Sequence, residues 1–173
     1  IVYFSNDQDG MKTVSYWMMG SLGGASWENN AIVVPISILG VLFFWTQYRT
    51  LNLMLLGDES AITLGTDLHP WRQLYLLVSS LMVGFAVYCA GVIGFVGLVI
   101  PHVVRILFGT DHCRLIPLSA LLGSSFLIWC DVACRVILKN SEMPIGVLVS
   151  IIGAPCFIYL LVRKSYGFGG KKG

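Results

Sequence analysis

The sequence has little charge. Asp, Glu, Lys and Arg make up 12% of its 173 residues, whereas 56% of the residues are hydrophobic and the mean hydropathy is +0.79. A soluble domain of ordinary composition carries about 25% charged residues, so this chain lacks the polar surface needed to cover itself in water. The net charge of +2 comes without a basic stripe, which excludes the electrostatic footprint of a typical nucleic-acid-binding protein. The composition indicates a protein that lies in a lipid bilayer.

The sequence also lacks the motifs of several enzyme classes. It contains no Walker A pattern, so any ATP hydrolysis linked to this chain is expected on a separate subunit. The zinc-protease pattern His-Glu-x-x-His is absent. The segment Gly24-Ala25-Ser26-Trp27 resembles a membrane serine-protease motif only loosely, because the closing glycine is missing. We therefore expect no catalytic residue and no cofactor bound by this chain, and an intramembrane enzyme is the least favoured function.

Cysteine is present without a disulfide or metal framework. The five cysteines include no Cys-x-x-Cys pair, and their odd number fits no simple disulfide pattern. Most of them lie inside apolar runs, where a free cysteine behaves as a small buried hydrophobic residue. His102 has no second histidine or carboxylate four residues away, so we expect no metal site.

Long apolar runs are what the sequence does contain. Four stretches approach the roughly 20 residues that a helix needs to cross a bilayer; they are residues 31–48, 74–93, 115–138 and 144–162. A further stretch, 94–108, is too short to cross unaided, and the run 14–22 is expected to form a short interfacial helix. Backbone groups cannot stay unpaired in lipid, and the alternation of a membrane barrel is absent. The predicted fold class is all-α, a polytopic transmembrane helical bundle with short broken helices.

The basic residues predict the orientation of the chain in the membrane. If the chain starts outside, the inner segments hold most of the Lys and Arg residues, namely Arg49, Arg72, Arg105, Arg114, Arg163, Lys164, Lys171 and Lys172. The outer segments then hold only Lys12, Arg135 and Lys139. The positive-inside rule therefore predicts a cytoplasmic C-terminus and a cytoplasmic loop at residues 49–72.

The loop at residues 49–72 has the pattern of a pair of short helices. Asp58 is placed to cap a helix, Gly65 is placed to end it, and Thr66 or Asp67 can start a second one. A solvated connecting loop is one interpretation. The loop, however, also contains apolar residues that a solvated connection does not need, and these favour a docking element for a cytoplasmic partner. They are Leu55, Leu56, Ile62 and Leu64.

Two apolar segments contain glycine and proline, which predicts interrupted helices. Short, interrupted membrane segments indicate a transport pathway, although a kinked packing helix gives the same pattern. In the first segment, His102 and Arg105 share one helical face, and Arg105 is expected to extend to the cytoplasmic interface. The candidate gating residues are Gly94, Gly97, Pro101, His102, Met143, Pro144 and Gly146, and the second segment continues with Gly153 and Pro155.

A charged pair lies inside the run 115–138. Asp131 and Arg135 are four residues apart with the acid first, which is the favourable order for a helical pair. An unpaired charge costs about 2.5–3.5 kcal/mol at the bilayer centre, so a structural ion pair is favoured over a substrate contact. Glu142 is expected at the outer mouth, either solvated or facing a basic residue of a partner.

Several of these motifs together resemble the FecCD-type permeases of ABC transporters. The coupling loop of that family is similar to Gly57-Asp58-Glu59-Ser60-Ala61 with Leu64-Gly65, and its most recognisable motif is similar to Gly94-Phe95-Val96-Gly97-Leu98-Val99-Ile100-Pro101-His102 with Arg105. Further matching segments are Trp17 to Gly23, Asp111-His112, Leu115 to Ala120, Asp131 with Arg135, Met143 to Gly146, and Gly153-Ala154-Pro155. The resemblance covers essentially the whole chain. Its departures are small: Asp58 stands where Glu is commoner, and Met143 where Leu is commoner.

The resemblance implies that residues 1–173 are the C-terminal half of a permease transmembrane domain whose earlier spans are missing. It implies a second permease copy or homologue around one pore, two cytoplasmic ATP-binding subunits and an extracytoplasmic substrate-binding protein, in a bacterial plasma membrane. ATP-driven movement would pass through the loop at residues 49–72 to the spans. The implied substrate is an iron-siderophore, haem or cobalamin, with an iron chelate favoured. A secondary transporter and a passive structural subunit are the alternatives.

Overall fold

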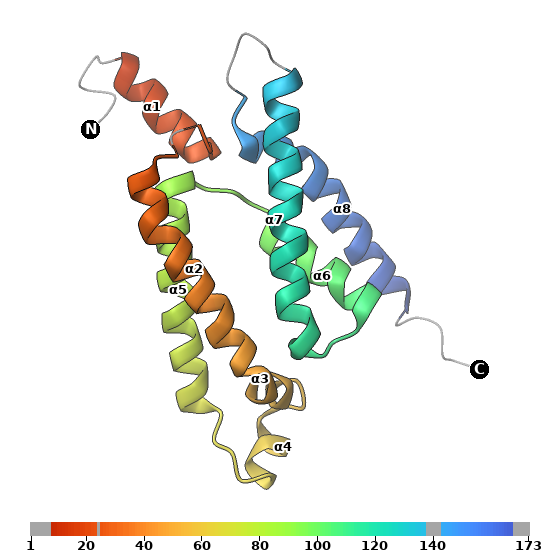
Figure 1. Cartoon of the computed structure of the whole chain (residues 1–173). Coiled ribbons are helices and arrows are strands. Elements are labelled where there is room, and N and C mark those ends of the chain that lie inside the picture. The colour runs from red at the N-terminus through yellow and green to blue at the C-terminus, as the bar shows by residue number, and fades with distance from the viewer. Residues whose placement is uncertain (1–7, 24, 138–142, 168–173) are drawn as a thin grey trace.

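The computed structural model describes residues 8–23, 25–137 and 143–167, and these residues form helices without any strand (Figure 1). The helices are α1 (Gln8–Met19), α2 (Trp27–Thr46), α3 (Tyr48–Met54), α4 (Asp58–Thr63), α5 (His69–Ala90), α6 (Val96–Phe108), α7 (His112–Ile137) and α8 (Ile145–Gly167). The all-α fold class predicted from the sequence is confirmed. The short helix expected around residues 14–22 corresponds to α1, which starts earlier.

Length and composition identify the helices that can cross a membrane. α2, α5 and α7 are long and apolar enough to do so, and they correspond to the predicted spans at 31–48, 74–93 and 115–138. α6 is a shorter apolar helix, as expected from the run 94–108. The apolar part of α8, Ile145–Leu160, is also shorter than a full span.

Two of these spans begin earlier than the apolar pattern suggests, and at both starts a polar side chain bonds to a backbone N–H of the first turn. Ser26 precedes α2, and its hydroxyl oxygen accepts a hydrogen bond from the backbone N–H of Asn29 at 3.2 Å. The first turn of α2, from Trp27, is therefore helical although it is polar. At the start of α5, a carboxylate oxygen of Asp67 accepts a hydrogen bond from the backbone N–H of His69 at 2.9 Å. The Ser26 cap thus starts α2 before its apolar run, whereas α5 starts after Leu68 without a side-chain cap.

The interruptions predicted inside the two apolar segments are absent. Gly97 and Pro101 are inside α6, which is continuous, and the chain breaks before it, at residues 91–95. α8 is continuous through Gly153 and Pro155, so the predicted interruption of this span is wrong. A proline inside a helix removes one backbone hydrogen bond, and neighbouring groups in a membrane protein can satisfy the freed carbonyl.

The break between α5 and α6 contains a left-handed residue that bears a side chain. Phe95 has a φ of 64°, a conformation that costs a residue with a Cβ about 1–2 kcal/mol. Its ring packs against α8 at Gly153, where an added Cβ would lie only 3.0 Å from the Cγ atom of Phe95. The glycine therefore leaves the room that Phe95 occupies at the start of α6.

The helices form two groups that meet where α2 contacts α7. α2 and α5 pack side by side, and α6, α7 and α8 pack together (Figure 1). Figure 1 shows α3 and α4 at one end of the molecule, which we call the elbow end, and α1 at the opposite end. α7 extends from the elbow end to the opposite end, and α8 runs back toward the elbow end. The elbow and the last described residues therefore lie toward the same side, as the orientation predicted from the basic residues requires.

Each group of helices has its own packing centre. Toward the opposite end, α7 and α8 bury a small core made of Cys130, Cys134, Ile145 and Val149. Near the elbow end, aromatic rings join α2 to α5: the ring centroid of Tyr75 lies 5.7 Å from that of Phe44, and 6.1 Å from those of Phe43 and Trp71. The aromatic group fixes α2 against α5 beside the elbow.

The cysteines are free thiols in the structure. Cys130 and Cys134 are buried in the core between α7 and α8, as expected for small hydrophobic residues. Cys89, Cys113 and Cys156 are only partly buried.

Candidate functional site

The segment formed by α3, α4 and the residues up to Leu68, which we call the α3–α4 elbow, is shaped by two glycines. Gly57 precedes α4 with a φ of 90°, and Gly65 follows α4 with a φ of 79°. Residues with a Cβ rarely adopt these left-handed conformations. No atom lies within 4 Å of a Cβ built on either glycine, so both positions need glycine for backbone conformation and not for space. The helix stop predicted at Gly65 is confirmed.

The pair of short helices is arranged differently from the prediction. The second short helix expected to start at Thr66 or Asp67 is absent, because residues 66–68 are not helical and lead directly into α5. The pair consists of α3 and α4, joined at residues 55–57. α3 is hidden in the sequence because it follows α2 after a single non-helical residue, Gln47.

Asp58 forms an ion pair instead of capping α4. The residue that caps α4 is Gly57, and Asp58 is the first helical residue, so its carboxylate lies at the positive end of the helix dipole. Nη2 of Arg72 donates to one carboxylate oxygen at 2.8 Å, and Nη1 donates to the other at 3.4 Å. The side chains are 58% and 52% exposed, so the pair contributes about 0–1 kcal/mol. It ties the start of α4 to the start of α5 only weakly.

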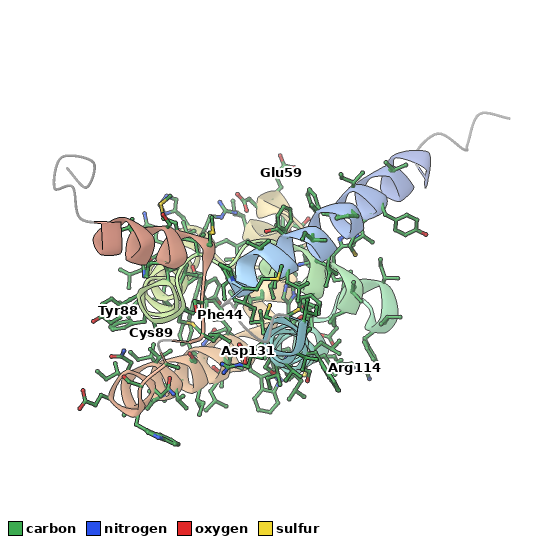
Figure 2. The ribbon with its side chains drawn as sticks, turned by 90° about the horizontal axis from the view of Figure 1, so that it is seen from above. Phe44, Glu59, Tyr88, Cys89, Arg114 and Asp131 are labelled. Atoms are coloured by element: carbon green, nitrogen blue, oxygen red, sulfur yellow. The ribbon has the colours of Figure 1, made fainter. Side chains whose placement is uncertain are left out.

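The α3–α4 elbow exposes several large apolar side chains. Four large side chains are more than half exposed: Leu55 (52%), Leu56 (62%), Ile62 (67%) and Leu64 (65%). Ala61 and Leu68, in contrast, are buried. Ser60 is exposed, and Glu59 projects away from the bundle (Figure 2). Exposed apolar side chains that gather at the tip of a polar loop are typical of an interaction surface.

Three chain segments meet at the opposite end without any side chain between them. We call this contact the glycine junction, and its glycines are Gly20, Gly91 and Gly146. A Cβ added at Gly91 would collide with the carbonyl oxygen of Trp17, and one added at Gly146 would collide with that of Met19. A Cβ added at Gly20 would lie 2.9 Å from the carbonyl oxygen of Val92, in the chain that follows α5. One of the predicted gating residues, Gly146, therefore serves to bring α8 against the end of α1.

The other predicted gating residues do not gather at one place. Met143 and Pro144 directly precede the glycine junction and are partly buried. Gly94 and Gly97 face open space, because no atom lies within 4 Å of a Cβ built on either of them. These two glycines, unlike Gly146, do not support a close helix contact.

Pro101 and His102 lie further along α6 and are partly buried. Within the described residues, no group of three His, Cys, Asp or Glu side chains could hold a metal ion. A hollow of about 440 Å³ lies along α5 and is lined by Leu77, Ser80, Leu81, Gly84 and Phe85. None of the predicted gating residues lines this hollow.

The ion pair predicted inside α7 is confirmed. Nε of Arg135 donates to a carboxylate oxygen of Asp131 at 2.8 Å, and Nη2 donates to the other oxygen at 3.3 Å. The side chain of Asp131, labelled in Figure 2, is 26% exposed, whereas that of Arg135 is 63% exposed. Glu142, predicted at the outer mouth, lies outside the described residues.

A polar contact between the α3–α4 elbow and α7 is not predicted by the sequence. Nδ2 of Asn52 donates to Oδ1 of Asp111 at 2.8 Å, and Oδ1 of Asn52 accepts from the backbone N–H of His112 at 2.9 Å. The same Asn52 oxygen lies 2.7 Å from Nδ1 of His112, so that ring nitrogen carries the proton. The hydrogen bond from Asn52, followed by one from the backbone N–H of Cys113, holds the pKa of Asp111 below its ordinary value. Asn52 and Asp111 stand out in the sequence as polar residues, but they are 59 positions apart, so no local pattern predicts their contact.

Comparison with known proteins places this arrangement in a family. Residues 1–163 match the FecCD transport family. The chain belongs to the FecCD transport family. The resemblance carried by its sequence motifs is therefore confirmed.

Curated relatives of this FecCD chain are permeases. It is 40% identical over 162 residues to the Vitamin B12 import system permease protein BtuC of Vibrio parahaemolyticus, covering 94% of this chain and 48% of that protein. It is 43% identical over 162 residues to BtuC of Yersinia pestis, with the same coverage. It is 40% identical over 159 residues to the uncharacterized ABC transporter permease protein YvrB of Bacillus subtilis, covering 92% of this chain and 45% of that one. The chain spans about half the length of the curated relatives it matches.

A solved structure has the same arrangement of helices. It is described as an inward-facing conformation of an ABC transporter of metal-chelate type, and it matches this FecCD chain with a TM-score of 0.86 at 32% sequence identity. The match covers 93% of this chain and 52% of that one.

Proposed function

We propose that this FecCD-family chain forms part of the transmembrane permease of an ATP-driven importer for a metal chelate. Membership of the family and the permeases among its relatives support this function. The observation that carries the proposal is the α3–α4 elbow, which presents an exposed apolar surface at one end of helices that can cross a membrane. The chain has no Walker A pattern, so ATP is hydrolysed by a separate subunit and the chain itself performs no bond chemistry.

The ATP-binding subunit docks on the α3–α4 elbow. Burial of Leu55, Leu56, Ile62 and Leu64 against a partner removes apolar surface from water, at about 25 cal/mol per Å² of such surface. α4 is short, contacts α3, and buries Ala61. The left-handed turns at Gly57 and Gly65 set its angle to α3 and α5. A movement of the docked subunit is therefore passed to the membrane helices through α4.

The α3–α4 elbow faces the cytoplasm of a bacterial cell, with the C-terminus on the same side of the plasma membrane. The basic residues near the elbow end support this orientation under the positive-inside rule; they include Arg49, Arg72, Arg105 and Arg114. A second permease copy or homologue and an extracytoplasmic substrate-binding protein complete the importer.

Vitamin B12 is the first substrate to test, because relatives at 40% and 43% identity are named vitamin B12 import permeases. Iron-siderophores and haem are metal chelates of the same class and come second. The iron chelate, which we expected only because it is the commoner substrate of such permeases, therefore takes the lower rank.

Uptake by proteoliposomes tests the proposal. The full-length permease, its ATP-binding subunits and its binding protein are reconstituted, and accumulation of radiolabelled cyanocobalamin, ferric siderophore or haem is measured. We expect accumulation only when MgATP is present on the side of the ATP-binding subunits. The control is the same complex with a substituted Walker A lysine in those subunits. Accumulation driven by a proton gradient without ATP would overturn the proposal in favour of a secondary transporter.

A further inference from the structure

The first turn of α7 is fastened to the α2–α3 segment by two side chains that lie far away in the sequence. Asn52 of α3 binds the backbone of His112, 60 residues later, and Trp45 of α2 binds the backbone of Cys113, 68 residues later. We call Trp45, Asn52, Asp111 and His112 the α7 clamp. Its contacts lie at the elbow end, beside the docking surface proposed for the ATP-binding subunit.

Asn52 caps α7 from another helix. The first N–H groups of a helix have no partner inside it. In α7 the N–H of His112 donates to Oδ1 of Asn52 at 2.9 Å, and the N–H of Cys113 donates to Oδ1 of Asp111 at 3.0 Å. Nδ2 of Asn52 also donates to that Asp111 oxygen at 2.8 Å, which joins the two caps. Loss of the Asn52 side chain would therefore leave an N–H of α7 without this partner and separate α7 from α3.

Trp45 uses an acceptor that Pro117 creates. Pro117 lies inside α7 and has no N–H, so the carbonyl four residues earlier, that of Cys113, loses its α-helical donor. The indole Nε1 of Trp45 donates to this carbonyl at 3.1 Å. The proline thus exposes a backbone acceptor at the start of α7, and the tryptophan at the end of α2 satisfies it.

We propose that Trp45 and Asn52 are positioning residues that make α7 move together with the α3–α4 elbow. This inference rests on the proposed function, because it concerns how movement of a docked ATP-binding subunit reaches the membrane helices. Without the α7 clamp, α4 and α3 would move while α7 stayed behind.

Because α7 is long, the α7 clamp can pass movement from the elbow end to the opposite end of the molecule. α7 has 26 residues, which corresponds to about 39 Å at 1.5 Å per residue and exceeds the roughly 30 Å of a bilayer's hydrocarbon core. At its far end Cys130 and Cys134 pack against Ile145 and Val149 of α8. A displacement of the first turn of α7 is therefore felt in the core between α7 and α8.

The Asn52–Asp111 contact is tested by a double-substitution cycle in the reconstituted importer. Asn52→Asp places two carboxylates face to face and should lower substrate uptake per ATP hydrolysed roughly fivefold. Asp111→Asn keeps the acceptor oxygen and should have little effect alone. Combined with Asn52→Asp, it removes the repulsion and should restore most of the ratio. A double variant no better than Asn52→Asp would overturn the assignment of Asn52.

The Trp45–Pro117 pair is tested in the same way. Trp45→Phe keeps an aromatic ring but removes the indole N–H, and it should lower uptake per ATP roughly threefold. Pro117→Ala returns an N–H that can satisfy the Cys113 carbonyl within α7. In the Pro117→Ala background, Trp45→Phe should then lower uptake per ATP clearly less than it does in the wild-type background. If Trp45→Phe lowers uptake per ATP equally in both backgrounds, Trp45 does not act through the Cys113 carbonyl and its positioning role is overturned.

Matched controls separate positioning from folding. Asn30→Asp and Trp129→Phe change the same residue types at exposed positions outside the α7 clamp, and they should leave uptake per ATP unchanged. A clamp variant that merely misfolds lowers uptake and ATP hydrolysis in proportion and keeps their ratio, which counts against the inference. If the wild-type complex shows no ATP-driven uptake, the proposed function fails; if it transports and the clamp variants keep its ratio, only this inference fails.

Discussion

The two ends of this FecCD-family chain are joined by different kinds of contact. At the elbow end, Trp45 and Asn52 connect helices through side-chain hydrogen bonds, each of which contributes about 0.5–1.5 kcal/mol. At the opposite end, the glycine junction brings backbone against backbone, and an added Cβ would collide with a carbonyl oxygen. The first kind of contact holds helices through a few side-chain hydrogen bonds, whereas the second tolerates no intruding group. The difference indicates an adjustable end beside the elbow and a fixed end across the membrane.

The largest effect is expected at the glycine junction. Gly91→Ala puts a Cβ against the carbonyl oxygen of Trp17 at a residue with a φ of 69°. Left-handed strain of about 1–2 kcal/mol and overpacking of about 1–3 kcal/mol should together lower the free energy of unfolding by about 2–5 kcal/mol. Thermal unfolding of the purified permease in detergent measures this, with Gly94→Ala, which meets no atom within 4 Å, as the control. Equal melting temperatures for the two variants would show that the junction is not fixed.

A smaller effect on stability is expected at the elbow end. In Gly57→Ala the new Cβ meets no atom within 4 Å, but the alanine must adopt a φ of 90°. That conformation costs a residue with a Cβ about 1–2 kcal/mol. Because the strain is relieved by changing the angle of α4, we expect uptake per ATP to fall while the folded permease persists. Gly84→Ala, in an open helical position, is the matched control and should keep the wild-type ratio. A wild-type ratio of uptake to ATP hydrolysis in Gly57→Ala would show that the turn at Gly57 does not contribute to coupling.

A substitution on the docking surface of the elbow should weaken binding of the ATP-binding subunit without lowering the stability of the permease. Ile62 is 67% exposed, so Ile62→Asp should change the free energy of unfolding by no more than about 0.5 kcal/mol. In the complex the same carboxylate would be buried in an apolar contact, and retention of the ATP-binding subunit should weaken about tenfold or more. Copurification of that subunit measures the loss, with the exposed neighbour Thr63→Asp as the control. Wild-type retention in Ile62→Asp would place the subunit elsewhere.

The smallest effect is expected for the exposed ion pair. Arg72→Gln breaks its contact with Asp58, and because both side chains are more than half exposed, the cost should be about 0–1 kcal/mol. The difference from wild type should shrink further at 1 M salt, where the Debye length is about 3 Å. Melting temperatures at low and high salt measure it. A loss as large as that of Gly91→Ala would mean that the elbow end is as rigid as the junction.

Local features of the fold could be predicted from the sequence. The length of the apolar runs identifies α2, α5 and α7 as helices that can cross a membrane. The spacing of Asp131 and Arg135 predicts their ion pair, and Gly65 predicts the end of α4. Each of these depends on residues within a few positions of one another, so a periodic pattern or a turn residue is enough to reveal it.

Features that depend on distant residues could not be predicted. Neither Trp45 nor Asn52 carries a local sign that it will bind α7 about 60 residues later. Pro155 suggests a break, yet α8 is continuous through it, because a proline can be tolerated inside a membrane helix. The sequence also misplaces the helix pair of the elbow, because the boundary between α2 and α3 is the single residue Gln47, which gives no strong stop signal.

The contact made by Leu64 tests the central claim most directly. This side chain is 65% exposed at the end of α4, and a photo-activatable amino acid introduced there in the full-length permease reports which protein touches the elbow in the intact cell membrane. The same group at Leu121, 64% exposed on α7, is the control. We predict a cross-link from position 64 to the ATP-binding subunit and none from position 121. A cross-link from position 64 to the substrate-binding protein would place the elbow outside the cell and contradict the account.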